Sequence, residues 1–225
     1  MRGRNVLVAV LLAVAGWQWG GAVLIHTKAW LAPQLIARAW DATLASGQPQ
    51  KPWAWADTWP VARLRVPDHG IDQYVLAGAN GASLPFGPGH LDGSAAPGQP
   101  GTIVIAAHRD TYFGFLENLR GGALIVLETA AGGIRNFRVE TRSIADARIS
   151  SIEARNDFNQ LILVTCQPTN WLGYRGPYRL VITAIERRGL RQTGTAPRRQ
   201  HRGTNITAAA STRNIWSGSL AMTGA

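Results

Sequence analysis

The chain has 225 residues, of which 46% are hydrophobic, and it contains nine tryptophans. This length suits one domain with appended segments, and the apolar content excludes a disordered chain. The net charge of +10 suggests a nucleic-acid partner, but residues 186–225 hold seven arginines against one acidic residue and so carry +6 of it. Because this tail has no RNA-binding aromatic motif, helix-turn-helix pattern or Cys/His metal spacing, we expect a solvated basic tail and no nucleic-acid binding.

The N-terminal segment predicts a membrane anchor. Residues 6–25 are apolar except for Gln18 and follow two arginines. At about 1.5 Å per residue in a helix, this run spans roughly 30 Å, the thickness of a bilayer core. The positive flank predicts a cytoplasmic N-terminus, with the rest of the chain on the outer side. A signal peptide cleaved at the A-x-A site over 13–15 is the alternative, and its short apolar core favours an uncleaved anchor over residues 1–26.

The next segment combines a helix and a linker. Residues 27–46 show an amphipathic helical pattern, with Trp30, Leu31 and Trp40 among the apolar positions. This pattern indicates a stalk that packs on the following domain or lies at the membrane. Residues 47–60 are rich in proline and tryptophan and form a linker.

From residue 61 the pattern changes to alternation with a period of two, which is typical of strands. Seven apolar runs are expected to form strands: 61–66, 71–77, 102–106, 123–128, 136–144, 161–165 and 178–185. A brief helical stretch is expected near 111–119. Seven or eight short strands indicate an all-β barrel or sandwich over residues 61–187. After Arg188 the periodicity stops, so we expect residues 188–225 to be mostly disordered.

The single cysteine, Cys166, follows an apolar strand in the stretch "LILVTCQPTN". In an oxidising compartment structural cysteines come in pairs, and a lone cysteine cannot form an internal disulfide. Cys166 is therefore either a buried, inert side chain or a nucleophile presented at a strand end. The residue alone leaves both readings open.

A reactive thiol needs a base or cation and a donor for the developing oxyanion. Of the five histidines, only His108 follows a buried-type strand, in "TIVIAAHRDT", whereas His26, His69, His90 and His201 fall near the membrane, in turns or in the tail. Two such strands side by side would bring imidazole and thiol to one rim. Arg179, at the start of "YRLVITAI", could donate to an oxyanion.

Two further residues near these positions have weaker claims. Arg175, inside a Gly/Tyr/Pro loop, is a second choice to Arg179. Asp110 could orient His108, but an aspartate at this position is more typical of a turn cap.

Together these residues resemble the sortase family of membrane-anchored cysteine transpeptidases. The resemblance rests on "IVIAAHRDTYF", "LILVTC" and "PYRLVITA", and it covers about residues 60–187. The stretches "KPWAWADTWPVARL" and "LPFGPGHL" look most like the class GN sortases of Gram-negative bacteria. Two departures are Ala107, where the family usually has glycine before the histidine, and Gln167, where tyrosine or threonine is common.

The resemblance implies a sortase-like closed β-barrel of seven to eight strands with short helices, behind the transmembrane anchor. It implies that Cys166 attacks the threonine carbonyl of a C-terminal Leu-Pro-x-Thr-Gly-like (LPxTG-like) signal and forms a thioacyl-enzyme. His108 would act as acid and base, Arg179 would bind substrate or oxyanion, and Thr165 would contribute to the substrate site. The partners would be an exported protein with such a signal, an amine acceptor and the lipid bilayer.

On this resemblance we expect no metal and no organic cofactor, and a location in the inner membrane with the catalytic domain in the periplasm. Two other classes stay open. One is an exported cysteine endopeptidase that hydrolyses the same acyl-enzyme. The other is a membrane-tethered β-barrel binding module in which Cys166 is inert.

Overall fold

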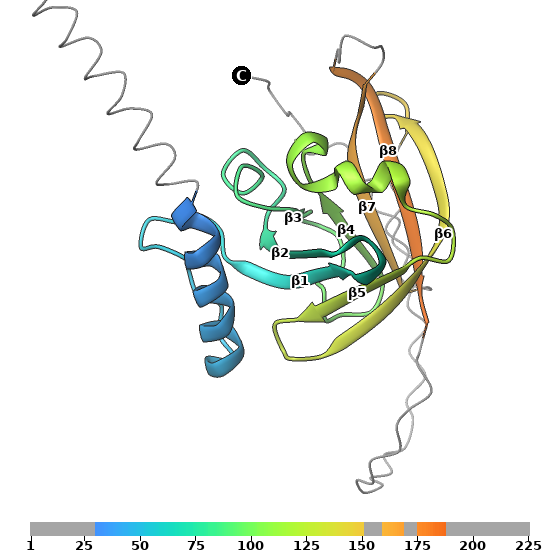
Figure 1. Ribbon diagram of the computed structural model, residues 1–225. Coiled ribbons are helices and arrows are strands. Elements are labelled where there is room, and N and C mark those ends of the chain that lie inside the picture. Colours follow the sequence, from blue (N-terminus) through green and yellow to red (C-terminus); the bar gives the residue numbers. More distant parts are fainter. Residues whose placement is uncertain (1–29, 151–158, 169–174, 188–225) are drawn as a thin grey trace, which may run out of the picture.

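The computed structural model describes residues 30–150, 159–168 and 175–187 (Figure 1). The predicted anchor, residues 1–26, and the predicted tail, residues 188–225, lie outside the described residues. Within the described ranges, no helix combines the length and the apolar character that crossing a membrane requires.

Eight strands close into one barrel, in the order β1-β2-β3-β4-β7-β8-β6-β5. Their bounds are β1 (Pro60–Val66), β2 (Ile71–Ala77), β3 (Gly89–His90), β4 (Thr102–Ala106), β5 (Leu124–Thr129), β6 (Ile134–Asp146), β7 (Gln160–Pro168) and β8 (Arg175–Glu186). Most neighbours are antiparallel, but β2–β3 and β4–β7 are parallel pairs. The prediction of an all-β closed barrel of seven to eight strands is confirmed.

The barrel interior holds the main hydrophobic core. In β1 every second residue is buried, so Ala62, Leu64 and Val66 face inward while the two arginines between them face out. The predicted helical stretch is present as two short helices, η2 (Arg109–Phe113) and η3 (Gly114–Asn118). They insert Phe113 and Leu116, both fully buried, into the same core. Full burial of such a side chain stabilises the fold by about 1.5–3 kcal/mol.

Strands β4, β7 and β8 are apolar on their outer face as well. There a second buried cluster forms, and it consists of Ala79, Leu91, Val104, Ala106, Ile162, Val164 and Val181. The segment between β2 and β4 supplies two members of this cluster, Ala79 and Leu91. Burial on both faces explains why these strands read as continuous apolar runs in the sequence, since neither face needs polar residues.

The three largest differences from the predicted strand bounds concern β3, β7 and β8. β3 was expected to be part of a loop, but it pairs with β2. The backbones come so close there that a Cβ at Gly89 would collide with the Gly78 carbonyl, so the pairing requires glycine. β7 continues past Cys166 to Pro168, with a bulge, instead of turning at Gln167. β8 begins at Arg175 and not at residue 178.

The helix before the barrel covers residues 30–46 and packs on β2. Its buried face contains Ala32, Ile36, Ala39 and Trp40, whereas Trp30 and Leu31 are exposed. The Trp40 ring lies 6.1 Å from that of Tyr74.

The linker that follows the helix is bonded into the barrel as well. The Thr58 hydroxyl donates to the carbonyl of Ala77 at 2.8 Å, and the Ala77 amide donates to the carbonyl of Trp59 at 2.8 Å. Helix, linker and barrel therefore form one packed unit (Figure 1).

Candidate active site

The strands that carry the predicted histidine and cysteine are parallel neighbours. Ala106 of β4 pairs with Val164 of β7, and the Ala107 amide donates to the Val164 carbonyl at 3.2 Å. His108 lies two residues beyond Ala106, and Cys166 lies two residues beyond Val164. The prediction that these two strands lie side by side is confirmed.

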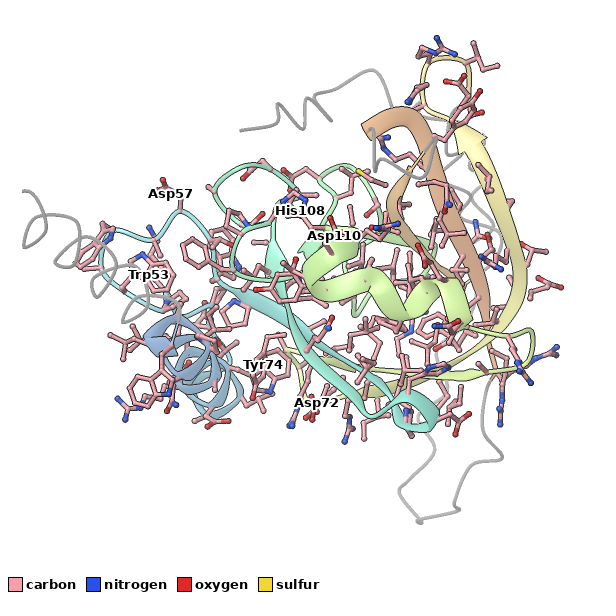
Figure 2. All side chains as sticks on the ribbon, turned by 45° about the horizontal axis from the view of Figure 1, so that its top comes forward. Trp53, Asp57, Asp72, Tyr74, His108 and Asp110 are labelled. Atoms are coloured by element: carbon pink, nitrogen blue, oxygen red, sulfur yellow. The ribbon has the colours of Figure 1, made fainter. Side chains whose placement is uncertain are left out.

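The predicted arginine is on the adjoining strand. Cys166 of β7 and Arg179 of β8 are direct partners in the antiparallel register. Because side chains alternate between faces, Cys166 shares the outer face with Val164, and Arg179 shares it with Val181. His108 follows the outward-facing Ala106 by two residues, at the end of the barrel from which η2 departs (Figure 2).

Exposure changes along this face. Val164, Val181 and Ala106 are buried, whereas Cys166, His108 and Arg179, two positions further along, are each partly exposed. The three polar side chains therefore lie at the edge of an apolar floor. Hydrogen bonds and charges next to such a floor are weakly screened by water, which favours their use in stabilising a developing charge.

Arg179 has donors that the protein leaves unused. Its Nη1 donates to the carbonyls of Gly176 and Tyr178, both at 3.0 Å. Its Nε is buried and has no hydrogen-bond partner, and the same holds for Oε1 of Gln167. Only four buried side-chain atoms of the described residues lack a partner, and these two belong to the residue after Cys166 and to the partner of Cys166 in β8. Since an unpaired buried polar atom costs about 1–3 kcal/mol, both are candidates for contacts with a substrate.

Thr165 faces the other way. It is 1% exposed, and its hydroxyl donates to the Ala107 carbonyl at 2.8 Å, on the barrel-interior face where its partner Leu180 lies. The hydroxyl therefore joins the residue before Cys166 to the residue before His108. This geometry gives Thr165 a positioning contact, and its contribution to the substrate site stays a prediction.

The two weaker candidates have other surroundings. Asp110 accepts from Arg109 Nε at 2.9 Å, and no side chain caps the first turn of η2, so neither expected role of Asp110 is seen. Glu117 contacts the same guanidinium at 3.2 Å, and hydrogen bonding to Asp110 raises the pKa of Arg109. Arg175 is the first residue of β8 and pairs with Pro168.

His90, expected at the surface of a loop, is half-buried instead. Its Nε2 lies 2.9 Å from the Ala95 carbonyl and 3.0 Å from the Ser94 hydroxyl. Burial lowers the pKa of His90 below its ordinary value. The signal that the sequence offered was the pair of glycines around Pro88, which allow the close approach of β3 to its neighbours.

The described residues contain no group of three or more His, Cys, Asp or Glu side chains that could hold a metal ion. The chemistry that the site itself offers is that of a thiol and a guanidinium at paired positions of β7 and β8, with an imidazole two residues beyond the end of the neighbouring β4. This set suits nucleophilic acyl transfer, in which the thiol attacks, the imidazole moves protons and the guanidinium stabilises an oxyanion.

Comparison with known proteins gives the same family. The model of the sortase domain matches residues 64–186, more than half of the chain. Sortase D of Bacillus subtilis (strain 168) is 27% identical over 191 residues, which are 78% of this chain and 93% of that protein. The structure is similar to a Clostridium perfringens Sortase D5 transpeptidase, with a TM-score of 0.52, 18% identity and coverage of 69% and 95% of the two chains.

It is also similar to Sortase A from Corynebacterium diphtheriae, with a TM-score of 0.50 and 23% identity. That alignment covers 62% of this chain and 66%, just under two thirds, of the other. At these identities the solved structures establish the fold, and the family model establishes the family. The chain belongs to the sortase family and is a cysteine transpeptidase.

Proposed function

We propose that this protein is a membrane-anchored sortase that cleaves an LPxTG-like sorting signal between threonine and glycine and transfers the acyl group to an amine. The observation that carries the proposal is the register of β4, β7 and β8. This register pairs Cys166 with Arg179, whose Nε has no hydrogen-bond partner, and His108 follows the end of the strand next to that of Cys166.

In the acylation step, His108 takes the thiol proton and Cys166 Sγ attacks the threonine carbonyl carbon. The electron pair of the carbonyl π bond moves to oxygen and makes it an oxyanion, to which Arg179 donates through its unpaired Nε. When the oxyanion re-forms the carbonyl, the C–N bond to glycine breaks. His108 gives its proton to the leaving nitrogen, and a thioester on Cys166 remains.

In the transfer step, His108 accepts a proton from the incoming amine as its nitrogen attacks the thioester carbonyl. The C–S bond breaks and the electron pair returns to Sγ, which regains the proton. Thr165 holds the two reacting strands together through Ala107, so it acts as a positioning residue. Gln167 Oε1, buried and unpaired, is suited to accept from a backbone N–H of the bound signal peptide.

The finer assignments rest on the sequence. The apolar segment 6–25 with its positive flank supports a single anchor, with the catalytic domain in the periplasm at the inner membrane. The stretches "KPWAWADTWPVARL" and "LPFGPGHL" support a class GN enzyme. The partners are an exported protein that ends in a sorting signal, an amine acceptor and the bilayer.

The test is a transpeptidation assay on the full chain in detergent. A peptide containing Leu-Pro-x-Thr-Gly is incubated with and without a short glycine peptide, and the products are identified by mass spectrometry. We expect the acyl fragment joined to the added amine with the wild type, and no product with Cys166→Ala.

Two results would overturn the proposal. If product ends only in a free threonine carboxylate even at saturating amine, the enzyme is an endopeptidase. If the Cys166→Ala variant makes as much product as the wild type, the chemistry does not use this thiol. A thermal unfolding curve of the Cys166→Ala variant, compared with that of the wild type, is the control for an intact fold.

A further inference from the structure

A group of large apolar side chains is exposed at one end of the molecule, beside the start of the helix over 30–46. Trp30 is 68% exposed, Leu31 42%, Trp55 81% and Phe86 36%. We call these four residues the aromatic end. Two of them are tryptophans, the residue type that is enriched where a protein meets the interface of a bilayer.

The aromatic end is held on a rigid frame. The helix is fixed to the barrel through buried Trp40, and the linker is tied back to the helix by the Gln50 amide, which donates to Thr43 Oγ1 at 3.1 Å. The linker then returns to the level of the helix start (Figure 1). There Trp53 packs edge-on against Phe86, with ring centroids 5.2 Å apart (Figure 2).

Trp30 and Leu31 in the first turn are the most exposed large apolar side chains of the helix, and Leu44 near its other end is 37% exposed. Between them the outward positions include Gln34, Arg38 and Asp41, all suited to water. Lys51, also exposed, lies in the linker near Trp53. An apolar end with a lysine beside it, followed along the helix by outward polar residues, matches the chemistry of a bilayer surface, where rings enter the headgroup region and lysine contacts phosphate.

The position of the aromatic end in the chain indicates that a bilayer, and not a soluble partner, contacts it. Four residues separate the apolar run 6–25 from Trp30, so the two are at most about 18 Å apart even if the chain between them is extended. If that run crosses a bilayer, Trp30 cannot lie far from the surface of the same bilayer. A soluble partner would have to compete with lipid that is always within reach.

We propose that the aromatic end docks into the headgroup region of the phospholipid bilayer that holds the N-terminal anchor, and thereby fixes the orientation of the barrel. This inference rests on the anchor in the proposed function. The C-terminal end of β4, after which His108 follows, points to the same side of the molecule as the helix start (Figure 1). Docking therefore holds the catalytic rim toward the membrane, where a signal followed by its own apolar segment would emerge.

The test places spin labels on the full chain in vesicles of phosphatidylcholine and phosphatidylglycerol. In a Cys166→Ser background, a label at Trp55→Cys is compared with one at Ile134→Cys. Ile134 is a matched control, since it is apolar and 60% exposed but lies at the start of β6, at the opposite end of the barrel. We expect the label at 55 to be accessible to oxygen and shielded from a water-soluble nickel complex, and the label at 134 to show the reverse.

Equal access of the nickel complex to both labels, in protein that floats with the vesicles, would overturn the docking while leaving the anchor intact. Dipolar broadening at position 55 that disappears on dilution with unlabelled protein would also overturn it, in favour of a second copy of the chain. Protein that fails to float with the vesicles would overturn both anchor and docking. The detergent transpeptidation assay tests the chemistry separately.

A second measurement keeps Cys166 intact. The double variant Trp30→Ser/Trp55→Ser is expected to process a soluble signal peptide at the wild-type rate, because neither residue belongs to the catalytic face. We expect it to process a signal joined to an apolar membrane segment several-fold more slowly in vesicles. Equal rates on both substrates in both proteins would contradict the docking.

Discussion

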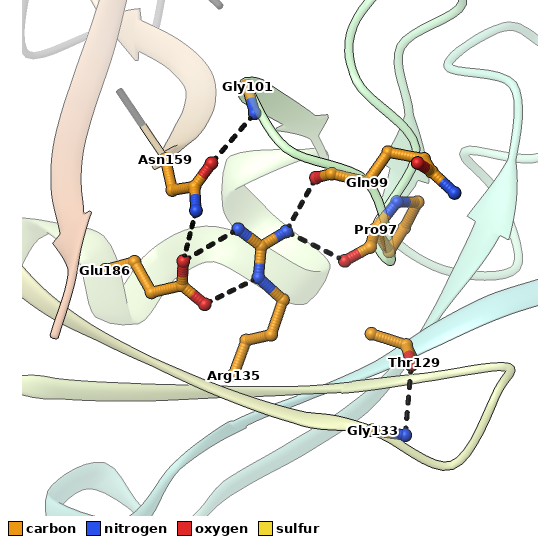
Figure 3. Close-up of polar contacts among 8 residues, drawn as sticks. All are labelled: Pro97, Gln99, Gly101, Thr129, Gly133, Arg135, Asn159 and Glu186. Atoms are coloured by element: carbon orange, nitrogen blue, oxygen red, sulfur yellow. Dashed lines mark hydrogen bonds and ion pairs between the residues drawn. The ribbon is translucent and has the colours of Figure 1, made fainter. Parts of the chain in front are cut away.

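The two ends of β8 carry polar clusters of opposite character. At the far end, all three guanidinium nitrogens of Arg135 are bonded (Figure 3). Nε and Nη2 contact the Glu186 carboxylate at 2.7 and 3.0 Å, and Nη1 donates to the carbonyls of Pro97 and Gln99. Asn159 completes the network by donating to Glu186 at 2.7 Å and accepting from the Gly101 amide at 3.0 Å.

At the catalytic end, Arg179 bonds two carbonyls of its own strand through one nitrogen and leaves a buried Nε unpaired. Both arginines are partly buried side chains of the same barrel, so residue type alone does not distinguish them. The difference lies in their hydrogen bonds. Those of Arg135 join strands and loops, whereas Arg179 keeps an unpaired donor that is available to a ligand. We expect substitutions at one end to change stability and substitutions at the other end to change catalysis.

The largest effect is expected for His108→Ala. Loss of the group that moves protons in both steps should lower kcat/KM by roughly 10³-fold or more, with little change in the free energy of unfolding. Steady-state transpeptidation and urea unfolding measure the two quantities. His69→Ala is the matched control, because His69 is a partly exposed histidine of the turn between β1 and β2. Equal activity losses in the two variants would contradict the assignment.

For Arg179→Ala we expect kcat/KM to fall by about 10²–10³-fold, the range found when an oxyanion donor is removed. Unfolding should change little, because only two bonds to its own strand are lost. Arg179→Lys should recover little activity, since an ammonium carries its donors on one nitrogen and does not reproduce the planar donor geometry of a guanidinium. Full recovery with lysine would show that charge alone is needed.

Arg135→Ala should show the reverse. Breaking a mostly buried ion pair costs about 3–5 kcal/mol of unfolding free energy, and kcat/KM at a permissive temperature should stay near the wild-type value. Arg63→Ala is the control, since its pair with Asp72 is bidentate but exposed and should cost no more than about 1 kcal/mol. A large loss of activity in fully folded Arg135→Ala would contradict the view that this end of β8 serves stability and not catalysis.

Thr165→Val tests the contact that joins the two catalytic strands. The change keeps the side-chain shape but removes the donor to the Ala107 carbonyl, which should cost about 1–3 kcal/mol of unfolding free energy. We expect kcat to drop by about tenfold with KM nearly unchanged, and Thr165→Ser to restore both. A rise in KM alone would indicate direct substrate contact instead.

The smallest effect concerns pH. Burial lowers the pKa of His90, against smaller opposing effects of the Ala95 carbonyl and Asp92, so the unfolded chain binds a proton more readily than the folded protein. Stability is then full above the ordinary histidine pKa near 6.5 and declines as pH falls below it, by less than about 1.4 kcal/mol per pH unit. His90→Gln should flatten this slope in urea titrations between pH 7.5 and 5. An unchanged slope would show that groups other than His90 cause the pH dependence of stability.

Much of the fold was predictable because strand periodicity is local. The alternation in 61–66 predicted β1 correctly, and the apolar runs before His108 and Cys166 predicted two buried strands at the heart of the barrel. The two residues of β3 had no such pattern, since their pairing depends on contacts with Gly78 and Ala106, distant in the sequence. Short pairings of this kind arise from tertiary packing, which single-residue preferences do not encode.

The site was predictable in its residues but not in its geometry. The order of His108, Cys166 and Arg179 along the chain indicated the family, whereas their shared face depends on the parallel register of β4 and β7. The direction of Thr165 could not be read without that register, because a one-residue shift reverses every side chain. The ion pair between Arg135 and Glu186 joins residues 51 positions apart, and no periodic signal connects them.

The most direct measurement is the mass of the acyl-enzyme. Wild-type protein is mixed with signal peptide in the absence of an amine, quenched in acid within the first turnover, and digested for mass spectrometry. The account predicts that the peptide fragment ending in threonine is attached to Cys166, and that Arg179→Ala accumulates this adduct much more slowly than Arg135→Ala. Cleaved peptide without any adduct on Cys166, or equal rates in the two arginine variants, would contradict it.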